Sequence, residues 1–422
     1  MNKFYPPKEN KLLIKFAKFI LPWALKSIYK IEKIEIDIND IEKLKSLKGK
    51  RVILCPNHPT TNDPILMFYL SKLIDHNFNY LAAWDIFVET PLRGYFIQQL
   101  GAYSIIRGTI DNNSFKKTIE IIKEGKNFLV IFPEGDTCGL NDYLMPFQTG
   151  VIQLAFWALD ELIKDNSQND SNLFIIPIAI RYKYLKPMKK EIETILTNIE
   201  KKLKIYDPKL KMHDPKNNLL DFYYERLMKI SEKLLNSTEK YYNLKSNTNL
   251  PFNERLQKIK EFIINKIANY LDIKFKPDMN LLDKIRLLFN TINTIVYDNA
   301  NLNRNNFENE ISEYERKLYQ EKKQELKSFI DDLNRVWRFV AVYEGYIKEK
   351  MNDERFLEIL KRIEWEVFGK EKSYGPLKAI LKLGKEINLK DYYQDYKANK
   401  RKCIENLIQL LENQIKEMLN IL

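Results

Sequence analysis

The stretch VILCPNHPTTNDP, residues 52–64, decides how this chain folds around its most informative side chains. Its first four residues form a short apolar run of the kind found in buried β-strands, and a helix-like pattern begins at Pro64. The turn between them places His58 and Asp63 five positions apart. Histidine suits general-base chemistry because its unperturbed pKa is about 6.5. A neighbouring carboxylate fixes the tautomer of such a base and stabilises its charged form.

The same residues also have a purely structural interpretation. Asp63 would be the N-cap of the helix and Pro64 its first residue, which is a favoured arrangement at helix starts. His58 would then be an ordinary loop residue. Both interpretations hold together if one aspartate serves both purposes. Nothing beside the pair resembles an activated nucleophile, so direct attack by a substrate hydroxyl is the simpler chemistry.

Strand-like and helix-like segments alternate on either side of this stretch, from about residue 31 to 182. The helical segment Ser114–Glu124 has Ser114 as its candidate N-cap and Gly125 just past its end. Such alternation predicts an α/β fold with a mostly parallel sheet flanked by helices. Four short apolar runs are typical of its buried strands: Val52–Cys55, Tyr103–Ile106, Leu129–Phe132 and Ile175–Ile180.

The pattern changes at about residue 183. From there to about residue 372, Lys/Glu-rich periodic segments such as Phe307–Ile347 and Asp353–Val367 predict an all-helical region. Strand character returns in Gly375–Gly384, where apolar and polar residues alternate. An amphipathic helix is expected from about Tyr396 to the last residue.

Residues 10–29 are expected to form an amphipathic helix that Pro22 kinks or interrupts. Lysines on one face and large apolar side chains on much of the rest are typical of a helix lying in a membrane interface. The alternative is a helix packed on the core of the protein itself. We therefore expect residues 1–30 to form a membrane-interface segment, with these side chains in contact with lipid: Lys11, Lys15, Phe16, Lys18, Phe19 and Trp23.

Composition narrows the possible partners. The net charge is +12, and the first thirty residues hold seven lysines against one glutamate. This excess fits anionic lipid, and no basic stripe interleaved with aromatics suggests nucleic acid. The three cysteines show no paired spacing and fit reduced thiols, while the three histidines form no His/Cys cluster that would hold zinc. With no apolar run of 18 residues, we expect a peripheral protein on the cytoplasmic side of a membrane.

Three further segments accompany the His/Asp pair. Gly101–Gly108 is a strand ending in Arg107, whose guanidinium is suited to phosphate, although most arginines at strand ends are surface residues. Phe132–Gly135 is a strand end followed by a turn that carries Glu134, which could equally be solvated. Ile176–Ala179 is a buried strand with Pro177 near its start.

In this order and spacing, these segments resemble the four motif blocks of the glycerolipid acyltransferase family (PlsC-like, 1-acylglycerol-3-phosphate acyltransferases). His58 and Asp63 match its H-x4-D block, and Gly101 with Arg107 matches the block that ends in a phosphate-contacting arginine. The F-P-E-G block is matched by Phe132–Gly135 and the proline of the fourth block by Pro177.

The resemblance implies transfer of a fatty acyl group from a thioester to the hydroxyl of a lysophospholipid or glycerol-phosphate-type acceptor, as in phospholipid biosynthesis. His58 and Asp63 would be the general-base pair, with no covalent intermediate. Arg107, Glu134 and Gly135 would bind the acceptor. The co-substrate would be acyl-CoA or an acyl carrier protein thioester, and neither a metal nor another cofactor is implied.

The resemblance also implies a divided catalytic domain. Its first part would be residues 31–182, and residues 373–422 would add a closing strand and a C-terminal helix. The helical region 183–372 would then be an insertion. A membrane-associated scaffold of the same fold, silent in catalysis and acting through this insertion, is the alternative.

The chain departs from the family pattern around the expected acceptor. Asp136 and Thr137 follow the F-P-E-G block where the family usually has Thr-Arg, and Gln148 replaces a common lysine. Trp84 and Asp85 stand where a basic residue is frequent. The acceptor site is therefore expected to be less cationic than usual, with Arg107 as its main positive charge.

Overall fold

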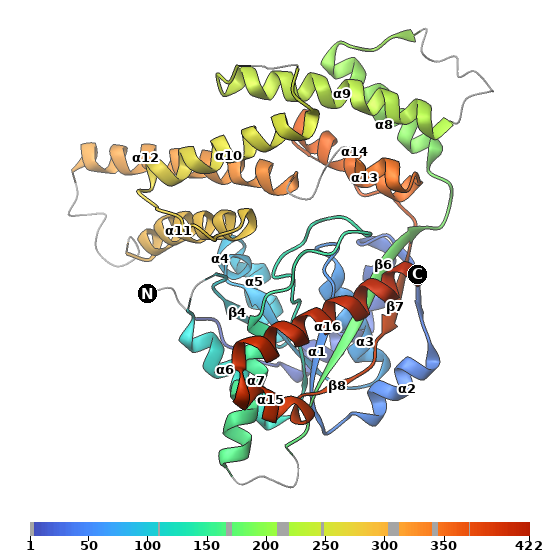
Figure 1. Ribbon diagram of the computed structural model, residues 1–422, viewed down its shortest axis with the longest axis vertical. Helices are drawn as coiled ribbons and strands as arrows, with labels where there is room; N and C mark the ends of the chain where they lie inside the picture. Colours follow the sequence, from blue (N-terminus) through green and yellow to red (C-terminus); the bar gives the residue numbers. More distant parts are fainter. Residues whose placement is uncertain are drawn as a thin grey trace. The chain divides into compact units, whose positions relative to one another are not determined.

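The structure is a computed structural model, and it describes residues 4–108, 110–165, 171–208, 219–245, 249–302, 312–339, 345–370 and 372–422. Two compact units make up the chain (Figure 1). The first, called here the sheet unit, comprises Met1–Lys183 and Gly375–Leu422. The second, the helical unit, is Tyr184–Tyr374. These boundaries lie one and two residues from those expected for an insertion at 183–372.

The described residues of the sheet unit build one eight-stranded sheet in the order β1-β7-β6-β2-β5-β3-β4, with β8 paired to β6. The neighbouring strands are parallel in the pairs β1/β7, β6/β2, β2/β5, β5/β3 and β3/β4, whereas β8 is antiparallel to β6. The predicted α/β class is confirmed. The strands are β1 Ile31–Ile36, β2 Arg51–Pro56, β3 Phe78–Ala83, β4 Ala102–Ile105, β5 Phe128–Val130, β6 Leu173–Tyr184, β7 Leu377–Leu383 and β8 Ile387–Asn388.

Strand β2 lies in the middle of the sheet and shows why its residues form a strand. Ile53 is in register with Leu129 of β5 on one side and with Ile175 of β6 on the other. Successive side chains point to opposite faces, so Ile53 packs into one apolar cluster and Leu54 into the other. Both faces are buried, which explains an unbroken apolar run instead of an alternating one.

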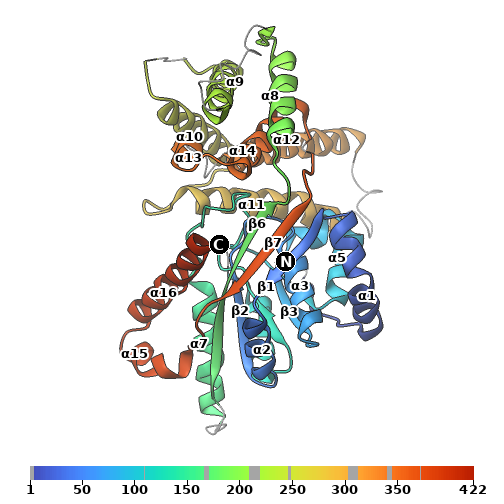
Figure 2. The same cartoon turned by 90° about the vertical axis from the view of Figure 1, so that its right-hand side faces the viewer.

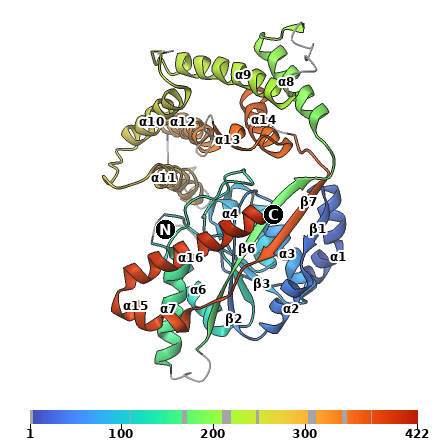
Figure 3. The same cartoon turned by 45° about the vertical axis from the view of Figure 1, so that its right-hand side comes forward.

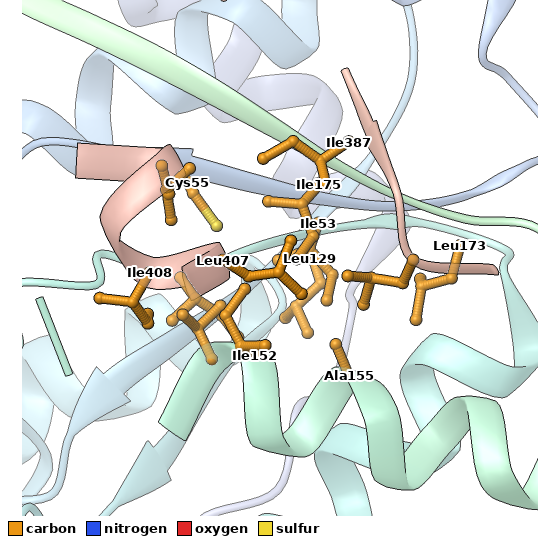
Figure 4. Packing of buried hydrophobic residues seen from close by; sticks show 14 of the residues in the cluster. Ile53, Cys55, Leu129, Ile152, Ala155, Leu173, Ile175, Ile387, Leu407 and Ile408 are labelled. Atoms are coloured by element: carbon orange, nitrogen blue, oxygen red, sulfur yellow. The ribbon is translucent and has the colours of Figure 1, made fainter. Parts of the chain in front are cut away.

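Helices cover both faces of the sheet, and Figure 3 shows them on its two sides. One cluster joins the strands to α6, α7, α15 and α16, and Figure 4 shows the side chains that meet there. The other joins them to α1, α2 and α3. The helices of this unit are α1 Lys11–Ser27, α2 Ile38–Ser46, α3 Asp63–Leu73, α4 Asp85–Glu89, α5 Pro91–Gln99, α6 Asn112–Glu124, α7 Gly150–Lys164, α15 Tyr393–Ala398 and α16 Lys400–Ile421.

Three helix details differ from expectation. Ser114 is not the N-cap of α6, because Asp111 caps the helix and accepts a hydrogen bond from the Ser114 N–H. Gly125 does end that helix, in the left-handed conformation at φ 60°. Asp63 is the first residue of α3 and Asn62 its N-cap. Helix α1 continues through Pro22 without interruption.

The C-terminal segment completes the sheet. Strand β7 lies between β1 and β6 (Figure 2), with Ala379 in register with Ile34. The N–H of Gly384 then donates to the carbonyl of Pro177, 2.9 Å away. A Cβ at Gly384 would lie 2.7 Å from Gln414 Oε1 and 3.1 Å from Pro177 Cγ. The chain therefore passes closely between β6 and α16, and a larger residue would require the end of Gln414 to move.

The described part of the helical unit after the end of β6 contains helices and no strand. Of the predicted segment 307–347, helix α12 accounts for 313–338, and Ser312 and Glu315 form a capping box at its start; positions 307–311 and 340–344 lie outside the described residues. The helices are α8 Lys189–Leu203, α9 Leu219–Tyr241, α10 Phe252–Tyr270, α11 Leu281–Leu302, α12 Glu313–Arg338, α13 Gly345–Glu349 and α14 Asp353–Phe368.

Because α16 supplies core residues to the sheet, we expect Ile415→Ala to destabilise the sheet unit. Ile415 is fully buried, so its truncation leaves a cavity and should cost about 2–5 kcal/mol of unfolding free energy. The matched control is Ile421→Ala in the same helix, where the side chain is 72% exposed and the change should be below about 0.5 kcal/mol. Urea denaturation measures both. Equal stabilities for the two variants would contradict the packing of α16 on the sheet.

Candidate active site

The loop that follows β2 is anchored to the neighbouring strand β6. The N–H of Asn57 donates to the carbonyl of Ile178 over 3.1 Å. The side chain of Asn57 accepts from the N–H of Ile180 at 2.6 Å and donates to the carbonyl of the same residue at 3.1 Å. Three bonds therefore hold the backbone in place directly before His58. No role was predicted for Asn57, because its partners lie more than 120 residues away in sequence.

His58 and Asp63 meet as predicted. Nδ1 of His58 lies 2.7 Å from Oδ2 of Asp63. A carboxylate only accepts, so Nδ1 carries the proton and Nε2 has the free lone pair. The imidazole stacks on the ring of Phe132, with centroids 4.0 Å apart, and the His58 side chain keeps 14% of its surface exposed. The ring is thus fixed in one tautomer and one orientation while still reaching solvent.

The carboxylate of Asp63 is fully buried and surrounded by donors. Oδ2 also accepts from the backbone N–H of Thr60 at 2.9 Å, and Oδ1 accepts from the Thr60 hydroxyl at 2.9 Å and from the Tyr182 hydroxyl at 2.6 Å. A buried carboxylate is stable only with such partners. Burial and the charge of Asp63 raise the pKa of Tyr182 well above its usual value, so its hydroxyl remains a donor. Sequence analysis missed Tyr182, which lies on β6, 119 positions from Asp63.

Glu134 lies beside this pair but faces inward. One of its oxygens accepts from the backbone N–H of His58 at 2.5 Å and the other from the N–H of Met145 at 2.9 Å. The residue is 1% exposed, and burial raises the pKa of its carboxyl to about 8 despite these two donors. The carboxyl group thus joins the loop that carries His58 to the segment before α7. Contact with an acceptor hydroxyl, as expected from the sequence, would require this buried side chain to become accessible.

Gly135 shapes the turn after Glu134. Its φ of 73° lies in the left-handed region that favours glycine. Its N–H donates to the carbonyl of Phe132 at 3.0 Å, closing the turn. This amide is therefore occupied, and it would have to leave the turn before it could serve an oxyanion or an acceptor. The carbonyl of Gly135 in turn accepts from Arg107 at 3.2 Å.

Arg107 is already paired with two carboxylates of its own chain. Its Nη2 lies 3.1 Å from Oδ2 of Asp85, and its Nη1 donates to Oδ2 of Asp136. Both partners stand at the positions where the sequence departs from the family pattern. Glu89 adds to this cluster, since burial and then the charge of Asp85 raise its pKa. An acceptor phosphate that reaches Arg107 would therefore share the guanidinium with two carboxylates that already bind it.

Helix α1 presents two different faces. Ile14, Ala17 and Leu21 are buried against the sheet unit. Lys18 also faces the protein, because its ammonium donates to the carbonyl of Ser71 at 3.3 Å and to Oδ1 of Asn77 at 3.0 Å. Lys18 was expected among the lipid contacts, and in this structure its ammonium binds the protein itself.

The opposite face of α1 carries an apolar ridge in solvent. The exposed fractions are 80% for Leu12, 57% for Phe16, 80% for Phe19 and 63% for Trp23. These residues are spaced four, three and four positions apart, which aligns them along one side of a helix. Lys11 and Lys15 are exposed beside them. Among the described helices, none is long and apolar enough to cross a bilayer.

Within the described ranges, no group of three or more His, Cys, Asp or Glu residues is placed to hold a metal ion. All three cysteines lie among the described residues, and they are buried and outside any disulfide. Cys55 follows Leu54 in β2, and burial raises the pKa of its thiol far above the usual range. This thiol is therefore no activated nucleophile beside His58.

Comparison with known proteins gives one match. The family model described as Acyltransferase matches residues 35–181, while no curated protein matches the chain. The matched residues run from β1 into β6 and include His58, Asp63, Arg107 and Glu134, but they end just before Tyr182. The segment 35–181, with its parallel strands and the contact between His58 and the buried Asp63, belongs to the acyltransferase family, the PlsC-like glycerolipid acyltransferases.

Proposed function

We propose that the chain transfers a fatty acyl group from a thioester, acyl-CoA or an acyl carrier protein, to a hydroxyl of a lysophospholipid or glycerol-phosphate-type acceptor. The observation that carries this proposal is the 2.7 Å contact between His58 Nδ1 and the buried carboxylate of Asp63. This contact leaves Nε2 of His58 available as a base, and both residues lie in the segment that matches the acyltransferase family. Residues 31–182 and 373–422 would form the catalytic domain, and 183–372 an insertion.

In the proposed reaction, the acceptor hydroxyl attacks the thioester carbonyl while His58 Nε2 takes its proton. Asp63 stabilises the imidazolium that forms. The tetrahedral intermediate then breaks its C–S bond, and the imidazolium returns the proton to the leaving thiolate. The products are an ester and a free thiol, with no acyl-enzyme. General-base assistance of this kind is typically worth about 10²–10⁴-fold in rate.

The proposed site of action is the cytoplasmic surface of a membrane, where lysophospholipid acceptors are found. The apolar ridge of α1, formed by Leu12, Phe16, Phe19 and Trp23, supports it because its side chains lie in solvent beside two lysines. A silent scaffold of the same fold is the alternative. It would not require a histidine whose tautomer is set by a fully satisfied carboxylate, and it would consume no thioester with any acceptor.

We expect His58→Ala to lower turnover by at least about 10²-fold because the proton acceptor is lost. The protein should stay folded, because the two Thr60 donors and the Tyr182 hydroxyl still hold the Asp63 carboxylate. The matched control is Thr61→Ala, an exposed residue of the same loop, which should retain activity. Release of free thiol from an acyl thioester, measured with and without lysophospholipid, tests both variants. Similar rates for His58→Ala and the unaltered protein would refute the assignment.

For Glu134→Gln we expect a lower kcat with little change in the acceptor KM. The new amide group would face one of the two backbone N–H donors, so the loop that carries His58 loses a bond and about 1–3 kcal/mol of unfolding free energy. Steady-state kinetics with varied acceptor measure this, and exposed Glu124→Gln is the control. An unchanged kcat with a raised acceptor KM would instead place the carboxylate on the acceptor.

We also expect Phe16→Ser and Phe19→Ser to weaken binding to vesicles that contain anionic phospholipid. Each buried phenylalanine contributes roughly 1.5–3 kcal/mol, so each loss should reduce partitioning by about tenfold or more. Vesicle co-sedimentation measures the effect. Tyr314→Ser, at a position on α12 that is 69% exposed, is the control and should bind normally. Unchanged partitioning of the phenylalanine variants would exclude this face of α1 as the contact.

A further inference from the structure

The helical unit contains an apolar cavity of its own, remote in sequence from His58. Helices α9, α10, α12, α13 and α14 line it, and it encloses about 100 Å³. Its walls are mostly aliphatic and aromatic, with Leu227, Ile263, Val336 and Ile359 as examples. Cavities with apolar walls and few polar groups are typical of sites for small ligands. Apolar cavities of roughly 150 Å³ are large enough to take up benzene.

One charged side chain lies against this cavity without a partner. Lys260 of α10 lines the cavity and is only 6% exposed. No described group forms a hydrogen bond or ion pair with its ammonium. Burial lowers its pKa to about 8. An ammonium held in apolar surroundings without a counter-ion is costly. An anion that enters the cavity would therefore be attracted to Lys260 without competing with a carboxylate of the protein.

Two buried arginines of this unit provide a contrast. Arg226, of which 4% is exposed, binds Glu200 in a two-pronged pair and also Glu193. Arg255, 3% exposed, binds Glu239 in the same way and also Glu232. Each arginine has carboxylates from the protein as its counter-ions. Lys260 therefore differs in facing space that a ligand can fill.

The other two charged side chains that line the cavity are paired with each other. Arg335 and Glu366 form an ion pair 2.8 Å long, and the side chain of Arg335 is 31% exposed, which places this pair at the solvent side. A single ammonium balances one negative charge. A dianionic phosphate would keep one buried charge unbalanced, whereas a carboxylate would keep none.

We infer that this cavity binds a short aliphatic carboxylate, with the carboxylate on Lys260 and the hydrocarbon tail among the apolar side chains. Scaled against a cavity of roughly 150 Å³ that takes up six-carbon benzene, its volume of about 100 Å³ suits a tail of roughly four carbons. The site lies within one unit and shares no residue with the His58 pair, so this inference does not rest on acyl transfer.

Calorimetric titration of the full chain with pentanoate tests the site, with Lys260→Met as the variant. We expect saturable 1:1 binding to the unaltered protein and at least tenfold weaker binding to Lys260→Met. The variant should fold, because an apolar side chain of similar length removes the cost of burying a charge without a partner. Its thermal midpoint verifies this. Lys258→Met, two positions earlier on the exposed side of α10, should bind pentanoate normally.

Neutral and dianionic analogues complete the test. Pentan-1-ol should bind at least tenfold more weakly than pentanoate because it brings no charge to Lys260, and pentyl phosphate should also bind more weakly. Three results would overturn the inference: no saturable binding of pentanoate, equal affinity in Lys260→Met, or tighter binding of pentyl phosphate. Thiol release catalysed through His58 is a separate measurement, so failure here would leave the acyl-transfer proposal standing.

Discussion

The sheet unit depends on keeping one buried carboxylate satisfied. Asp63 is fully buried at the start of α3, and four donors from the catalytic loop and from β6 surround it. Removing any of them would leave part of a buried charge without a partner, which is costly in a low-dielectric interior. The same requirement fixes the loop between β2 and α3, ties it to Tyr182, and orients the imidazole of His58. Stability and the chemistry proposed here therefore rest on the same bonds.

Arg107 illustrates a second constraint, which is charge balance next to the reacting pair. The family resemblance implies a free guanidinium for an acceptor phosphate. In this chain Asp85 and Asp136 bind it instead, and Gly135 bridges it to the turn that carries Glu134. The two departures from the family pattern thus act together, because both place a carboxylate on one arginine. An acceptor that reaches this point meets a balanced ion-pair cluster in place of an unpaired cation.

The position of the helical unit in the chain also has a physical explanation. The chain leaves the sheet at the end of β6 and returns in β7, and these two strands are neighbours. A long segment inserted between neighbouring strands leaves the hydrogen bonds of the sheet intact, and loop closure costs little more for a long segment than for a short one. Tyr184–Tyr374 can therefore have its own core and its own buried ion pairs.

Local patterns in the sequence were enough to identify the buried strands, the end of α6 at Gly125, the change to helices after β6 and the return of a strand near residue 377. They also picked out the His58/Asp63 pair, because two residues five positions apart in one turn can meet without contacts from distant parts of the chain. Only the tertiary structure decided which partners complete the site: Tyr182 on Asp63, Asn57 on β6, the inward carboxylate of Glu134, and the two carboxylates on Arg107. These contacts join residues 11 to 123 positions apart, and no local periodicity or spacing specifies pairs at such separations.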